Sequence, residues 1–593
     1  MLLLRHVARR PHCQTRLVLI DNHPEEMTRS KLWLPFVCCF LLTRLAAQTA
    51  GPEDLYIHFN KSFYVSGEHI WAKVYFLGPL PEEASAVVYL DLIAPDGTVL
   101  VSDRLRRTGK YALWDRQIPY EWPSAYYLVR VYTRWNLQFG NDFVYTELLP
   151  IYHFPDEPVE RPDEWGATKQ GEAPAGPAGS GGLQIELLPL RETARSGEEV
   201  TLEFRVTDQA GRPVDASLSA SVLDLDWLPE EADRPYRLAD IWQRGRPEAK
   251  PGGAAIPSEK TLVYRGRASD PDSGEPLSTN YLSVHTTPAD QYFLVKCRDG
   301  AFEFSLPLFE GPQVVQLHDL NPFQPAIVAA ELEETAAPVL DYQLLTAEPV
   351  RTPAIDRYLY LLRKQRKLRE LFDVPLREYP VAVPGPLRDF EPNVRYRIEN
   401  YQAMEDIEEF LNEIILRSRI EREGERISLK LYNPKTKRLF PNSVWFWIDG
   451  YLTPDARTLF DLPLSAIDRL ELFTEKETII SQFEPTLAGA GVMAVFTKDR
   501  ELPLRIREAP NNLDIEGLHR PAAFDPVVPG PDDAWPDLRP VVHWAPELQS
   551  GTDGRMSFTF RATSAVGRLL LQVEGVSAEG LPGVLRAVVE VRR

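Results

Sequence analysis

Residue types that carry enzymatic chemistry are present in the sequence, but they are scattered. Seven histidines follow Met27, and none of them forms a His-x-x-x-His pair or lies beside a cysteine at zinc spacing. Neither a Gly-x-Ser-x-Gly motif nor a glycine loop followed by Lys-Ser/Thr occurs. Cys297 precedes Asp299-Gly300, where a buried bystander thiol is favoured over a reactive one. We therefore predict no catalytic, cofactor-binding or metal-binding residue.

Acidic residues cluster at one place, where Glu405, Asp406, Glu408 and Glu409 flank an expected helix. Paired carboxylates can act as acid and base or bind calcium. The spacing lacks the regular oxygen ligands and the glycine of an EF-hand, so a solvated helix face is favoured.

Aromatic residues give the one positive indication of a contact surface. Tyr120, Trp122, Tyr126 and Tyr127 gather around two prolines and are candidates for an exposed patch that binds a protein or a glycan. The alternative is that they fill a sandwich core that includes a tyrosine corner.

Composition excludes several classes of protein. The 593 residues suggest about four domains. With 44% hydrophobic residues the chain is not wholly disordered, and its 52 prolines favour turns and linkers. A net charge of −20 argues against nucleic acid and anionic lipid head groups as partners.

The amino end has the pattern of a secretory signal. A basic stretch at residues 27–31 is followed by an apolar run at 32–42 and small residues at 45–47. We assign residues 1–48 to a leader and signal peptide, the alternative being an anchor that is never cleaved. The expectation is an exported protein of the periplasm or outer membrane, with no transmembrane span after cleavage and with Cys297 as its one remaining cysteine.

Strand-like segments dominate the rest of the chain. Runs rich in β-branched and aromatic residues predict β-sandwiches, and a proline- and glycine-rich stretch predicts a disordered linker. The predicted β-sandwiches cover residues 53–152, 183–258, 259–335 and 501–593, with the linker at 153–182.

Two expected helices, near 355–372 and 404–420, place a helical connector at 336–425. Mixed helices and strands predict a small α/β domain at 426–500. The predicted fold class is therefore mainly β: tandem immunoglobulin-like β-sandwich domains, with a helical segment and one small α/β domain.

Three stretches resemble known families. Residues 55–73, with Tyr64, Gly67-Glu68 and Trp71, look like the opening of a macroglobulin-type domain. Residues 263–304, with Gly274-Glu275-Pro276-Leu277 and Asp299-Gly300, are similar to the carboxypeptidase-regulatory-like sandwich. Residues 444–497 resemble the plug of a TonB-dependent receptor through the motif residues Ile448, Asp449, Gly450, Gly489 and Gly491.

Departures from these families limit what the resemblance implies. Only 93 residues follow Arg500, too few for the barrel of about 22 strands that a TonB-dependent transporter needs. The run Lys296-Cys297-Arg298-Asp299 does not match the thioester motif of protease-trapping macroglobulins. We therefore expect a non-enzymatic envelope protein that binds a protein or glycan and that is associated with an outer-membrane transport or secretion assembly. The alternative is a peptide or glycan hydrolase, and the oligomeric state stays open.

Overall fold

The computed structural model describes residues 51–80, 84–154, 182–188, 193–228, 238, 256–277, 281–287, 291–319, 326–333, 347–374, 387–401, 404, 406–415, 418–424, 426–500, 506, 508–530 and 535–593. Contacts gather Pro52–Arg593 into one compact unit. The predicted signal peptide and nearly all of the predicted linker lie outside the described residues. Within the described part, no helix is both long enough and apolar enough to span a membrane.

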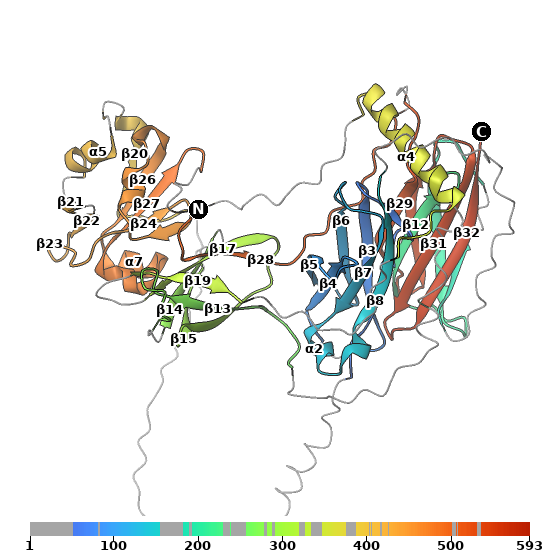
Figure 1. Ribbon diagram of the computed structural model, residues 1–593, viewed down its shortest axis with the longest axis horizontal. Coiled ribbons are helices and arrows are strands. Elements are labelled where there is room, and N and C mark those ends of the chain that lie inside the picture. The colour runs from blue at the N-terminus through green and yellow to red at the C-terminus, as the bar shows by residue number, and fades with distance from the viewer. Residues whose placement is uncertain are drawn as a thin grey trace, which may run out of the picture. The chain divides into compact units, whose positions relative to one another are not determined.

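The first β-sandwich consists of two sheets whose strands are mostly antiparallel, which confirms the predicted fold class for this segment (Figure 1). One sheet has the order β1 (Asp54–Phe59), β3 (His69–Leu77) and β6 (Tyr111–Gln117). The other has the order β2 (Tyr64–Val65), β8 (Tyr145–Tyr152), β7 (Ala125–Tyr132), β4 (Val87–Ile93) and β5 (Val99–Arg106). Alternate side chains from both sheets, such as Val74, Trp114, Leu90 and Val129, form the shared core.

A second sandwich is built from two segments that lie more than 300 residues apart in the sequence. One of its sheets has the order β9 (Gln184–Leu188), β11 (Glu199–Thr207) and β30 (Arg555–Arg561). The other has the order β10 (Thr193–Arg195), β32 (Pro582–Arg592), β31 (Gly567–Ser577), β12 (Ala216–Asp224) and β29 (Val541–Gln549). Figure 1 shows the red carboxyl-terminal strands β31 and β32 beside β12.

The prediction of separate sandwiches at 183–258 and 501–593 is therefore wrong. Neither segment alone has enough strands to cover an apolar sheet face, so each completes the core of the other, as when Phe204 stacks on Phe558 with ring centroids 5.6 Å apart. We call this shared domain the composite sandwich.

The segment predicted as a regulatory-like sandwich forms one continuous sheet, and its core includes residues of the first sandwich such as Val87 and Tyr89. Its strands follow the order β18 (Ala326–Ile327), β17 (Pro312–Asp319), β14 (Tyr281–Thr287), β15 (Gln291–Arg298), β16 (Ala301–Leu306), β13 (Leu262–Ser269) and β19 (Ala329–Leu332). Strand β28 (Asn512–Glu516) pairs with β17 and so joins this sheet. The prediction that assigns all of residues 501–593 to a separate sandwich is therefore wrong for β28.

The α/β domain has a five-stranded mixed sheet. Its order is β20 (Val394–Arg397), β26 (Ile467–Phe473), β27 (Val492–Thr497), β24 (Trp445–Ile448) and β25 (Tyr451–Thr453). The domain also contains three short helices, α5 (Ile407–Glu413), α6 (Arg457–Phe460) and α7 (Lys476–Gln482). A small second sheet is made of β21 (Ser418–Glu423), β22 (Arg426–Asn433) and β23 (Arg438–Leu439). Strand β20 comes from the predicted helical connector at 336–425.

The two expected helices have different outcomes. Helix α4 (Pro353–Leu371) matches the first within two residues, and the Thr352 hydroxyl caps it by accepting a bond from Ile355 N at 3.3 Å. The second expectation, a helix at 404–420, is wrong beyond Glu413, where α5 ends. Residues 418–423 instead form β21 and pair with β22, and Gly424, with a φ of 62°, supplies the positive φ that a tight hairpin turn requires.

Candidate functional site

The predicted aromatic patch does not form a single surface. Tyr127 lies in the sandwich core, and its hydroxyl donates a hydrogen bond to the Pro123 carbonyl at 3.0 Å. Trp122 is half-buried and stacks on Tyr127 with centroids 5.0 Å apart. Tyr126 is also half-buried, whereas Tyr120 is 52% exposed. Tyr127 is therefore not a partner contact, and the core interpretation holds for it.

The motif residues of the α/β domain build a turn. Ile448 ends β24 in the core, and Asp449 and Gly450 follow with φ of 46° and 102°. The Asp449 carboxylate accepts hydrogen bonds from the Thr497 amide at 3.0 Å and from the Thr497 hydroxyl at 2.5 Å. Burial raises the pKa of Asp449, and these two bonds act in the opposite direction. Asp449 thus ties the end of β24 to the end of β27.

The two remaining motif glycines shape the entry to β27. Gly489 ends a 3₁₀ turn, η5 (Pro485–Gly489). Gly491 has a φ of 77°, and a Cβ atom there would lie 3.3 Å from the Phe440 ring. Like Asp449, these two glycines have a structural role, because they allow the backbone conformation at the entry to β27.

A nucleophile, a base and an acid do meet in the structure, at a place that no motif indicated. Ser219 Oγ lies 2.6 Å from His58 Nδ1, and His58 Nε2 lies 3.7 Å from Glu574 Oε1. Such a trio activates serine hydroxyls in hydrolases. Here, however, Ser219 is fully buried and His58 is 6% exposed, in the interface between the first sandwich and the composite sandwich. A distance of 3.7 Å is also too long for a hydrogen bond that would orient the imidazole.

Lys73 shows what this interface does. Its buried ammonium group donates to Ser217 Oγ at 2.9 Å, to the Leu218 carbonyl at 2.9 Å and to the Pro546 carbonyl at 2.6 Å. Burial lowers the pKa of Lys73 well below its usual range. Because three acceptors satisfy its three N–H groups, Lys73 fastens β3 of the first sandwich to both segments of the composite sandwich.

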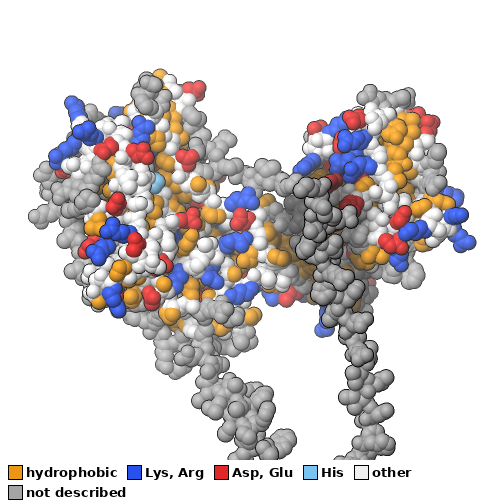
Figure 2. All heavy atoms as spheres, turned by 180° about the vertical axis from the view of Figure 1, so that it is seen from behind, with side chains coloured by type: hydrophobic (Ala, Val, Ile, Leu, Met, Phe, Trp, Pro, Cys, Tyr) orange, Lys and Arg blue, Asp and Glu red, His pale blue; other side chains and the backbone are white. Residues whose placement is uncertain are grey.

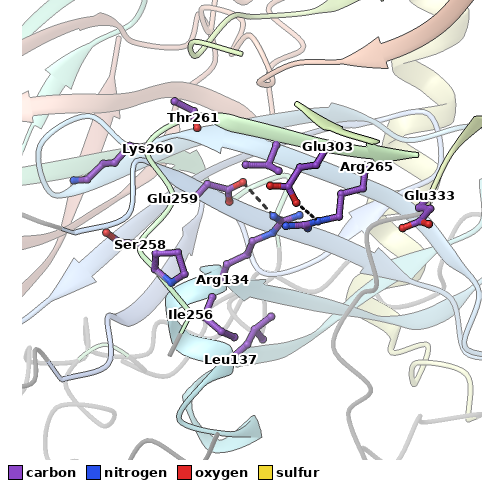
Figure 3. Close-up of a pocket in the computed structure, with 12 residues that line it drawn as sticks. Arg134, Leu137, Ile256, Ser258, Glu259, Lys260, Thr261, Arg265, Glu303 and Glu333 are labelled. Atoms are coloured by element: carbon purple, nitrogen blue, oxygen red, sulfur yellow. Dashed lines mark hydrogen bonds and ion pairs between the residues drawn. The ribbon is translucent and has the colours of Figure 1, made fainter. Parts of the chain in front are cut away.

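A charged cleft of about 620 Å³ opens among the described residues (Figure 3). It lies between the end of α2 (Arg134–Leu137) and the chain that leads into β13. Its walls carry three cations and three carboxylates as well as apolar and hydroxyl side chains. The lining residues are Arg134, Leu137, Ile256, Pro257, Ser258, Glu259, Lys260, Thr261, Val263, Arg265, Glu303 and Glu333.

The charges in the cleft are arranged as pairs. Glu259 is nearly buried; its Oε2 accepts a bond from the Tyr89 hydroxyl at 2.8 Å, and its Oε1 lies 3.5 Å from Arg134 Nη1. Burial raises the pKa of Glu259, and the Arg134 guanidinium opposes that effect. Arg265 Nε donates to Glu303 Oε2 at 2.6 Å, as the dashed line in Figure 3 shows.

The cleft has the size of a ligand site. Paired surface charges give specificity for a complementary partner. We call this surface the charged cleft, and sequence reasoning assigned it no role.

Comparisons of the sequence with known proteins assign the chain to no family. No protein-family model and no curated protein matches the sequence. Among solved structures, the chain is similar to the native conformation of Escherichia coli alpha-2-macroglobulin, at 11% identity and a TM-score of 0.23, over 92% of this chain and 40% of that one. Salmonella alpha-2-macroglobulin reacted with methylamine gives 11% identity and a TM-score of 0.23, over 91% and 40%. A DUF4785 family protein from Legionella pneumophila gives 9% identity and a TM-score of 0.14, over 47% and 55%. The chain thus spans about 40% of the length of these macroglobulins.

Proposed function

We propose that the protein is an exported, non-enzymatic component of the bacterial envelope that binds a protein partner, or a glycan, at the charged cleft. One observation carries this proposal. A cleft of ligand size is lined by the ion pairs Arg134–Glu259 and Arg265–Glu303, whereas the Ser219 and His58 side chains that suit catalysis are sealed in an interface. Binding is the function that this distribution of groups supports best.

A specific observation also favours the alternative, a peptide or glycan hydrolase. That observation is the approach of Ser219 to His58 at 2.6 Å with Glu574 nearby. A substrate would have to separate the two sandwiches to reach the Ser219 hydroxyl, which also lies 2.7 Å from the Tyr75 hydroxyl. The cost of breaking these buried contacts favours the binding function.

Association with an outer-membrane transport or secretion assembly is a further part of the proposal. Its support is the signal-like amino end and the resemblance of residues 426–500 to receptor plugs. The five-stranded sheet of this domain is small and compact, which suits a contact module.

Crosslinking with mass spectrometry in intact cells of the native host tests the proposal. We expect crosslinks to an envelope protein, with links that map to the rim of the charged cleft. Exchanging the charges of one wall pair, in the variant Arg265→Glu/Glu303→Arg, should weaken those links. The matched variant Arg212→Asp/Asp208→Arg, which exchanges an exposed ion pair on the composite sandwich, should leave them unchanged. Recovery of no envelope partner by the native chain would overturn the proposal.

A further inference from the structure

Helix α4 changes character halfway along its length. Its first half packs Tyr358 and Leu362 into a core shared by the first sandwich and the composite sandwich. The second half is rich in cations, five of them within seven residues, opposed by the single carboxylate of Glu370. These cations are Arg363, Lys364, Arg366, Lys367 and Arg369.

Some residues of this second half lie on one outward face of the helix. Lys364, Lys367 and Leu371 follow one another at intervals of three and four residues, so they share a face of the helix. That face is opposite the buried Tyr358 and Leu362. All three side chains are exposed, and Leu371 is 74% exposed. We call this surface, formed by Lys364, Lys367 and Leu371, the outward face of α4.

Neighbouring residues extend the same chemistry. The Arg366 guanidinium lies over the exposed ring of Tyr120, 5.5 Å from its centroid, and pairs with Glu370 at 3.6 Å. Phe372, at the end of the helix, is 38% exposed. Arg366 lies about 100° around the helix from Lys367, so Tyr120 contacts the flank of α4 and not its outward face.

The charge of the whole chain makes the local excess of cations informative. The net charge is −20, and the acidic groups that produce it are spread along the sequence. Figure 2 shows acidic and basic side chains interspersed over the face that it displays. At physiological salt, charges farther away than about 8 Å are largely screened, so a surface that meets α4 senses mainly its cations.

We propose that the outward face of α4 binds the anionic head groups of a phospholipid surface. Flexible lysines reach head-group phosphates without a shaped pocket, and the exposed Leu371, followed by the exposed Phe372, suits the boundary between head groups and acyl chains. This surface is separate from the charged cleft, so the inference does not depend on the proposed function.

Vesicle binding by residues 52–593, the compact unit without the apolar run at 32–42, tests this inference. The probes are vesicles of phosphatidylcholine alone and vesicles that also contain phosphatidylglycerol. We expect binding only to the second kind, and a loss of binding as salt is raised. Lys364→Glu/Lys367→Glu should weaken binding by at least about 25-fold, since each basic residue near an anionic surface contributes about five-fold. Leu371→Ser should weaken it by a smaller factor.

The matched control carries the same change of charge elsewhere. Arg205 and Arg555 are exposed and face each other across β11 and β30, so Arg205→Glu/Arg555→Glu replaces one like-charged pair by another. Its vesicle binding should stay within about two-fold of the unaltered chain. Failure of the unaltered chain to bind the anionic vesicles, or equal binding by the Lys364/Lys367 variant, would overturn the inference. Thermal melting of each variant establishes that it is folded.

Discussion

The hydroxyl of Tyr358, in the middle of helix α4, donates a hydrogen bond to Glu68 Oε1 at 2.6 Å, although 290 residues separate them. The other oxygen of Glu68 accepts bonds from Lys61 Nζ at 2.5 Å and from the Val65 amide at 2.7 Å. Glu68 belongs to the Gly67-Glu68 motif that resembled the opening of a macroglobulin-type domain. In this chain the Glu68 carboxylate stabilises a local turn and also binds helix α4, which belongs to the predicted connector at 336–425.

Removing the hydroxyl in Tyr358→Phe should lower the free energy of unfolding by about 1–3 kcal/mol, because the partly buried Glu68 carboxylate loses a donor and the buried Lys61 ammonium loses an acceptor. Urea denaturation measures the change. The control Tyr281→Phe, at a position 47% exposed, should change it by less than about 0.5 kcal/mol. Equal effects of the two variants would show that the bond to Glu68 does not stabilise the fold.

Asp224 should make stability depend on pH. Burial raises its pKa from 3.8 to about 7, and the nearby charges of Asp226 and Asp537 add to that effect. Since the pKa is raised in the folded state, the contribution of Asp224 to stability is most favourable below about pH 4 and becomes less favourable as the pH rises to about 7.

The variant Asp224→Asn retains an acceptor for the Asp226 amide and cannot ionise. It should therefore be more stable than the unaltered chain near pH 8, by up to about 4 kcal/mol, and nearly equal to it near pH 4. Unfolding measured at both pH values tests this, with the exposed Asp272→Asn as a control. A difference that is the same at both pH values would contradict the assignment.

Asp449 should tolerate asparagine better than alanine. Asparagine adopts a positive φ readily and keeps an acceptor for the Thr497 amide, whereas alanine loses both hydrogen bonds and is strained at a φ of 46°. We expect a loss of about 1 kcal/mol for Asp449→Asn and of about 2–4 kcal/mol for Asp449→Ala. Similar losses for the two variants would refute the role assigned to this turn.

Ser219 should not react with a fluorophosphonate probe, because its hydroxyl is sealed between two sandwiches. Mass spectrometry of the probe-treated, folded protein should detect no adduct at this residue. Ser219→Ala should instead lower stability by about 1–3 kcal/mol through its lost contacts with His58 and Tyr75. An adduct on Ser219 would favour the hydrolase alternative.

Local patterns carried enough information to predict the mainly β fold and helix α4. Alternating apolar residues such as Val200, Leu202 and Phe204 identify a strand with one buried face, and the pattern of Ile355, Tyr358 and Leu362 identifies a helix. Such patterns do not say which strand pairs with which. The pairing of β12 with β31 depends on contacts about 350 residues apart, so the composite sandwich was missed.

The same limit applies to the sites. Tyr120, Trp122 and Tyr127 are close in sequence, yet pleat and turn geometry bury the ring of Tyr127 and expose that of Tyr120. Glu259 and Arg134 are 125 residues apart, and neither lies in a recognisable motif. The charged cleft arises where two domains meet, and only the folded chain brings its charges together.

Binding of an envelope protein at the charged cleft can be tested by site-specific photo-crosslinking in living cells of the native host. A photoreactive amino acid is placed at Thr261, in the wall of the charged cleft, or at Thr201, an exposed position on β11 of the composite sandwich. We expect an adduct between the Thr261 position and an envelope protein that is absent from the Thr201 position and is reduced by Arg265→Glu/Glu303→Arg. No adduct at Thr261, or the same adduct at both positions, would contradict it.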